Sequence, residues 1–173
     1  EANKDKHFIA PGLAWLINTS YHASEWGLTP EVTKKMGYHR ELEIAVETLK
    51  KMIKRGIHIL PGGDYGFAWT PHGTNAKDLE YFMKYLGMSS MEALLSATAW
   101  GAAIMKLDGE LGRVKDGALA DLLLVDGDPL ADIRIRQDKK RILAVMKDGE
   151  FYRAPVPRDA RSSAPTRWQA VAA

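Results

Sequence analysis

The segment Ile57-His58-Ile59-Leu60-Pro61-Gly62-Gly63-Asp64 contains an apolar run, a pair of glycines and then an acid. The run is apolar except for His58, as expected of a strand that is buried on both faces of a parallel sheet. The two glycines permit close backbone approach and torsions that other residues resist. The segment therefore predicts a short buried strand with Asp64 directly after it, where a barrel places its chemistry. An aspartate that only caps the following turn is the alternative.

The residues around this segment predict an alternation of helices and strands. Apolar residues recur at helical spacing over residues 38–55, and Gly56 ends the pattern. Further upstream, the apolar run 7–16 is interrupted by Pro11-Gly12, which we interpret as a second buried strand, followed by a long loop over 18–30. Helix, glycine, buried strand and loop make the repeating unit of a barrel or a doubly wound fold, so the fold class is α/β.

The pattern changes from helical to strand-like near Gly109. Before it, residues 76–86 read as a helix closed by Gly87, and Ser89 with Glu92 forms a capping box that leads into a helix over 93–104. After it, Asp148-Gly149 is a strong hairpin signal. The predicted strands cover residues 119–125, 142–147 and 150–153.

Composition excludes several classes of function. The net charge is only +2 and the basic runs are short, so the charge pattern indicates no nucleic-acid surface. No apolar stretch approaches the roughly 20 residues of a membrane helix, and we expect no membrane partner. The absence of cysteine excludes disulfides and cysteine-based zinc sites.

Three segments together resemble the C-terminal part of the metal-dependent amidohydrolase superfamily. The first is Gly62-Gly63-Asp64, and the third is the hairpin 145–152. The second is an apolar run that lies between Gly117-Ala118-Leu119-Ala120-Asp121 and Asp126-Gly127-Asp128-Pro129-Leu130. The match favours the branch of imidazolonepropionase-like and prolidase-like proteins and covers about residues 8–152. It implies that residues 1–108 form the last strands and helices of a (β/α)8 TIM-type barrel. Residues 109–153 would then form part of a small β-sandwich, and 154–173, rich in Pro, Arg, Ser and Ala, a flexible tail.

The resemblance also implies a function. Family members hydrolyse amide-type C–N bonds, here in dipeptides or N-acyl amino acids, with one or two divalent ions, expected to be zinc. In them an aspartate after the eighth strand binds metal and carries a proton to the leaving amine, and Asp64 matches that position. The other metal ligands of the family, including a His-x-His pair, are missing here. Because a catalytic metal needs about three protein ligands, we expect this chain to be inactive without the N-terminal remainder of the barrel.

Three further residues are candidates for contact with a small-molecule substrate. His72 lies eight residues after Asp64 on the same predicted loop, and His22 lies on the preceding one. Tyr65 could line an apolar pocket with Phe67 and Trp69. For His72 the alternative is an exposed structural histidine, and for the aromatic residues the alternative is that they merely pack the loop down; no motif supports His22.

Two other functions remain open. The chain could be a non-catalytic structural or assembly fragment, or part of a deaminase or lactonase on the same scaffold. An open fragment of a barrel exposes sheet edges and apolar helix faces, so we expect homo-oligomerisation. The start, Glu1-Ala2-Asn3, shows no signal peptide, and the N-terminus that would carry one is expected to be absent. A cytoplasmic location is the expectation.

Overall fold

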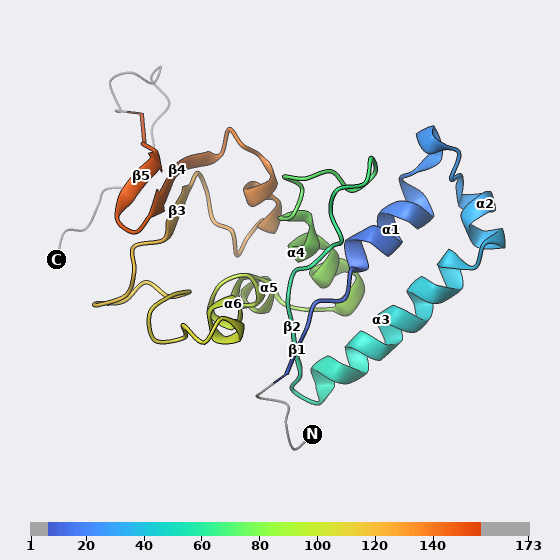
Figure 1. Ribbon diagram of the computed structural model, residues 1–173, viewed down its shortest axis with the longest axis horizontal. Coiled ribbons are helices and arrows are strands. Elements are labelled where there is room, and N and C mark those ends of the chain that lie inside the picture. The colour runs from blue at the N-terminus through green and yellow to red at the C-terminus, as the bar shows by residue number, and fades with distance from the viewer. Residues whose placement is uncertain (1–6, 157–173) are drawn as a thin grey trace.

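The computed structural model describes residues 7–156, and a pair of parallel strands lies at the centre of its first half (Figure 1). Strand β1 (Phe8–Ile9) pairs with β2 (His58–Ile59), with Phe8 opposite His58. The chain between them forms α1 (Leu13–Tyr21), the short helix η2 (Ser24–Trp26), α2 (Pro30–Lys35) and α3 (Tyr38–Lys54). Parallel strands joined by helices confirm the predicted mixed α/β class.

Helix α3 has the amphipathic pattern that the sequence predicts. Its bounds lie within one residue of the predicted range 38–55, and its buried residues are Leu42 and Leu49. These pack against Leu13 and Ile17 of α1 and Ile59 of β2 in the main core cluster. Helices α1, α2 and α3 therefore form one side of the molecule beside the strand pair (Figure 1).

Helix α1 corrects the prediction of a buried strand over 7–16 and of a loop from residue 18. Only two residues of that run are strand, because Gly12 adopts a left-handed conformation (φ 62°) and the helix begins directly after it. Seven of the nine α1 residues are buried, including Asn18, Thr19 and Ser20. A helix buried on nearly all sides has no polar face, so its sequence lacks the 3.6-residue period. The predicted loop 18–30 is shortened accordingly.

The helices after β2 follow the predicted order with one break. Helix α4 (Lys77–Tyr81) continues into a π-helical segment, η3 (Phe82–Leu86), which ends at Gly87 (φ 75°) as predicted. The capping box of Ser89 and Glu92 is confirmed at the start of α5 (Ser90–Ser96). The predicted helix 93–104 is divided, because Thr98 leaves helical torsions and α6 (Ala99–Ile104) starts after it.

A three-stranded antiparallel sheet lies at the opposite end of the molecule from α2 (Figure 1). Strands β4 (Ile142–Lys147) and β5 (Glu150–Arg153) have the predicted bounds, and both hairpin residues, Asp148 and Gly149, have positive φ. Strand β3 (Leu122–Val125) begins three residues later than predicted. The predicted tail from residue 157 onward lies outside the described residues.

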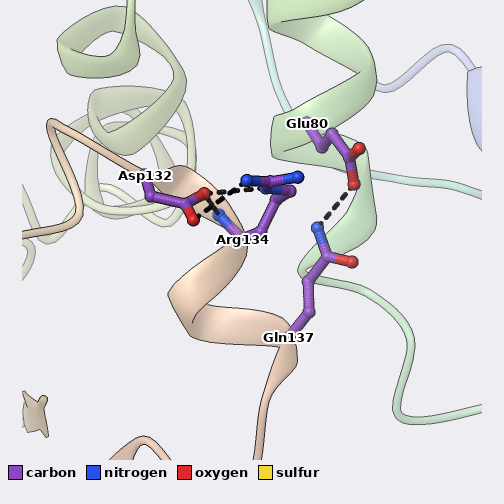
Figure 2. Close-up of polar contacts among 4 residues, drawn as sticks. All are labelled: Glu80, Asp132, Arg134 and Gln137. Carbon is purple, nitrogen blue, oxygen red and sulfur yellow. Dashed lines mark hydrogen bonds and ion pairs between the residues drawn. The ribbon is translucent and has the colours of Figure 1, made fainter. Parts of the chain in front are cut away.

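The sheet region is attached to the helices through α4. The 3-10 helix η4 (Ile133–Gln137) places Ile133 in a second core cluster with Leu79 and Ala93. On the surface, Gln137 Nε2 donates a hydrogen bond of 2.8 Å to Glu80 Oε2, and Arg134 pairs with Asp132 (Figure 2). No helix within residues 7–156 is long and apolar enough to cross a membrane.

Candidate active site

Asp64 follows β2 in an unusual backbone conformation. Its φ is 55°, in the left-handed region, which aspartate tolerates better than most residues. The glycines before it do not have positive φ; they are required for space. A Cβ at Gly62 would lie 2.7 Å from the Cβ of Ala10, and one at Gly63 would lie 2.6 Å from the ring of Tyr65. The expected close approach is confirmed, whereas the strained torsion belongs to Asp64 itself.

The Asp64 backbone is fixed while its carboxylate is exposed. The Asp64 carbonyl accepts a hydrogen bond of 3.2 Å from Oγ1 of Thr70, which is fully buried. Thr70 also closes the loop through hydrogen bonds of its main chain with Gly66 and Phe67. The Asp64 side chain makes no hydrogen bond or ion pair with any residue in the range 7–156. Both carboxylate oxygens are therefore free to bind a ligand.

The loop that carries Asp64 is attached to α1 through Trp69. The Trp69 indole nitrogen donates to Thr19 Oγ1 at 2.9 Å, and Asn18 Nδ2 donates to the Trp69 carbonyl at 2.9 Å. Tyr81 completes the network, because its hydroxyl donates to Asn18 Oδ1 at 2.6 Å. The buried polar residues of α1 thus hold the loop over the end of the strand pair.

The aromatic residues of this loop pack against their neighbours. Phe67 and Trp69 stack with ring centroids 5.6 Å apart, and Trp69 lies 5.9 Å from Trp26 of the preceding loop. Phe67 also meets Trp15 edge to face at 5.9 Å. These contacts support the packing alternative for Trp69, whereas Phe67 remains 42% exposed and still offers an apolar surface.

The two candidate histidines lie at different distances from Asp64. His72 is exposed, and a Cβ at Gly66 would lie 3.4 Å from its Nε2, so His72 folds back toward the Asp64 loop. His22 follows the last residue of α1, and nine helical residues, about 14 Å of axis, separate it from Gly12 beside Asp64. Partial burial and then the charges of Lys77 and Lys84 lower the pKa of His22. His72 is therefore the better placed histidine.

Tyr65 is half-buried and contacts its own loop. Its hydroxyl donates to the carbonyl of Asn75 at 3.3 Å, and its ring lies against Gly63. Burial, followed by the negative charge of Asp78, raises the pKa of Tyr65. A substrate contact by Tyr65 stays a prediction.

Asp78, which the sequence interpretation did not single out, is the buried acid next to this loop. It is 1% exposed, and its Oδ2 accepts a hydrogen bond of 2.9 Å from the Gly62 amide. Burial raises the pKa of Asp78, and the Gly62 amide and the Tyr65 hydroxyl oppose that rise. One sequence signal marks it: Asp78 precedes Phe82 by four residues and Leu86 by eight, so an acid lies on the apolar face of the helix.

The residues fit one part of a divalent metal site. Within residues 7–156 no group of three or more His, Cys, Asp or Glu side chains could hold a metal ion. Asp64 offers an exposed, unpaired carboxylate on the loop that follows β2, which suits a single oxygen ligand. The remaining ligands of such a site have to come from outside this part of the chain.

Two named enzymes and one crystal structure are similar to parts of this chain. Ochratoxinase of Aspergillus niger is 31% identical over 104 residues, which cover 60% of this chain and 21% of that protein. Imidazolonepropionase of Rubrobacter xylanophilus is 41% identical over 64 residues, 37% of this chain and 15% of that protein. The crystal structure of a Xaa-Pro dipeptidase with methionine bound in its active site matches 85% of this chain and 34% of its own, with a TM-score of 0.68 and 28% identity.

The chain thus spans well under half the length of each of these three proteins. The sequence profile of the amidohydrolase family matches residues 17–151, which is most of the chain and includes the Asp64 loop and strands β3 and β4 of the antiparallel sheet. This chain belongs to the amidohydrolase family.

Proposed function

We propose that this chain is the C-terminal part of a metal-dependent hydrolase that cleaves amide-type C–N bonds. The observation that carries the proposal is Asp64, an exposed and unpaired carboxylate on a rigidly held backbone at the end of β2. Family membership and the resemblance to ochratoxinase, imidazolonepropionase and a Xaa-Pro dipeptidase support it. Residues 1–108 would belong to the barrel, and 109–153 to a β-sandwich segment.

In this proposal Asp64 has two roles. It supplies one oxygen ligand to a divalent ion, zinc in one or two copies, whose other ligands come from the rest of the barrel. When bound, such an ion polarises a carbonyl and lowers the pKa of water toward neutrality. The other oxygen of the Asp64 carboxylate takes the proton from the attacking water and returns it to the leaving amine. Because the Asp64 backbone is held by Thr70, the carboxylate needs little reorganisation.

The substrate that we propose is a dipeptide or an N-acylated amino acid. The name of the dipeptidase relative supports the first, since that protein acts on Xaa-Pro peptides. His72 lies on the Asp64 loop with no hydrogen bond to another described residue, so it can donate to a substrate carboxylate or carbonyl. His22 and Tyr65 are weaker candidates for the same pocket.

The test is hydrolysis by the full-length protein of a panel with Xaa-Pro dipeptides, N-acyl amino acids, a lactone and an aminopyrimidine. We expect turnover of an amide substrate, loss of activity after chelation and recovery with zinc. His72→Ala should raise KM more than it lowers kcat. Turnover of only the lactone or the aminopyrimidine would assign the scaffold to another reaction, and no turnover of any substrate by the metal-loaded protein would favour a structural role.

A further inference from the structure

Asp78 is a buried acid whose contacts lie on both sides of Asp64 in the sequence. It is 1% exposed in α4, and its Oδ2 accepts the Gly62 amide proton across 2.9 Å. Asp78 also lies near Tyr65, and after burial its negative charge is the next cause that raises the pKa of Tyr65. An acid is costly to bury unless its partners compensate. The described residues give Oδ1 no partner, so the single hydrogen bond to Gly62 is its main compensation.

The main chain of Gly62 is held on both sides of its Cα. Its amide donates to Asp78, and its carbonyl accepts a hydrogen bond of 2.8 Å from the amide of Gly12, where α1 begins. The first bond holds the peptide unit between Pro61 and Gly62, and the second holds the unit between Gly62 and Gly63, so both peptide planes that flank the Gly62 Cα are fixed. Ala10 leaves no room for a side chain at position 62, so the backbone also lies tightly against the residue that follows β1.

The fixed main chain of Gly62 restricts the backbone conformation of the residues that lead to Asp64. A non-glycine residue with φ of 55° persists only where its surroundings enforce that conformation. Thr70 holds the carbonyl of Asp64, and Asp78 holds the amide of Gly62, two residues before Asp64. Loss of the bond to Asp78 would release the Gly62 amide and leave the bond from Gly12 as the remaining main-chain hydrogen bond of Gly62, so that the backbone leading to Asp64, and its carboxylate, could shift.

We propose that Asp78 is a positioning residue that orients Asp64 for catalysis through its hydrogen bond to the Gly62 amide. The inference rests on the proposed function of Asp64. Asp78 itself touches neither metal nor substrate. Its role predicts that an oxygen acceptor at position 78 matters more than the negative charge.

The test compares two variants of nearly equal size in the metal-loaded full-length protein. Asp78→Asn keeps an oxygen acceptor for Gly62, and Asp78→Leu removes it. We expect Asp78→Leu to lower kcat by about 10- to 100-fold, with KM within about threefold, and Asp78→Asn to restore most of kcat. In 15N-glycine-labelled protein the Gly62 amide proton should move upfield in the Leu variant only. The exposed Asp108→Leu is the matched control.

Wild-type kcat in Asp78→Leu, or an equal loss of kcat in both variants, would overturn the proposal. If the Leu variant does not fold, Asp78→Asn decides: a large loss of kcat with an unchanged Gly62 amide shift would contradict a role through this bond, and retained kcat with that shift unchanged would support it. Asp64→Asn in the same assay separates the claims. Full activity there would refute the proposed function, whereas its loss beside a fully active Asp78→Leu would refute only the role of Asp78.

Discussion

At the scale of single residues, two acids near the end of β2 have opposite surroundings. Asp64 is exposed and unpaired, and Asp78 is buried with one hydrogen bond. The sequence predicted the first, because an acid after an apolar run and two glycines marks the end of a strand. It did not single out the second, because whether an acid in a helix is buried depends on how that helix packs.

The raised pKa of Asp78 predicts a pH dependence of stability. Burial raises its pKa above the ordinary value of 3.8 in the folded state, so the folded protein binds the proton more tightly than the unfolded chain. The resulting stabilisation is complete below pH 3.8 and is lost as the pH rises through the folded pKa. Urea denaturation of wild type and Asp78→Asn should therefore show the wild type losing stability relative to the variant as pH rises from 4. A difference independent of pH would contradict this assignment.

At the scale of elements, the sequence predicted those with local signals. Helix α3 has an amphipathic period and a closing glycine, α5 has a capping box, and the β4–β5 hairpin has Asp148-Gly149. Helix α1 has none of these signals, because burial on nearly all sides removes the period, and its apolar start resembles a strand. Tertiary packing decides that segment, and the sequence alone does not describe it.

The attachment of the Asp64 loop to α1 gives a prediction at the same scale. Thr19→Val keeps the shape of a buried side chain but removes the acceptor of the Trp69 indole proton. An unpaired, partly buried donor costs about 1–3 kcal/mol, and we expect a loss of that size in urea denaturation, with a red shift of tryptophan fluorescence. Thr48→Val on the exposed face of α3 is the control. Equal stability of the two variants would show that this bond does not hold the loop.

At the scale of the whole molecule, the sheet region depends on a small contact with α4. Ile133 is 4% exposed and packs with Leu79 and Ala93, whereas Gln137 and Glu80 meet on the surface (Figure 2). We expect Ile133→Ala to cost about 2–5 kcal/mol through the cavity it leaves, and Gln137→Ala less than about 1 kcal/mol. Leu130→Ala, at a residue that is 43% exposed, is the control. The reverse order in urea denaturation would mean that the polar contact joins the two regions.

The sheets leave edges and apolar side chains exposed. Its parallel sheet has two strands, and the leucines of β3 are 39–52% exposed. A two-stranded sheet is marginal without further strands or packing, and exposed apolar strands invite association. The N-terminal barrel portion and homo-oligomerisation, which we expected from the lack of further metal ligands and from the open edges, stay proposals.

The most direct test of the central claim is metal content and kcat of Asp64→Asn in the full-length protein, measured beside wild type and the exposed control Asp108→Asn. Loss of a metal ligand and of the proton carrier should lower kcat by at least about a hundredfold and weaken metal binding, while Asp108→Asn behaves as wild type. Wild-type metal content and wild-type kcat in Asp64→Asn would contradict the account, and Asp64 would then only cap the turn that follows β2.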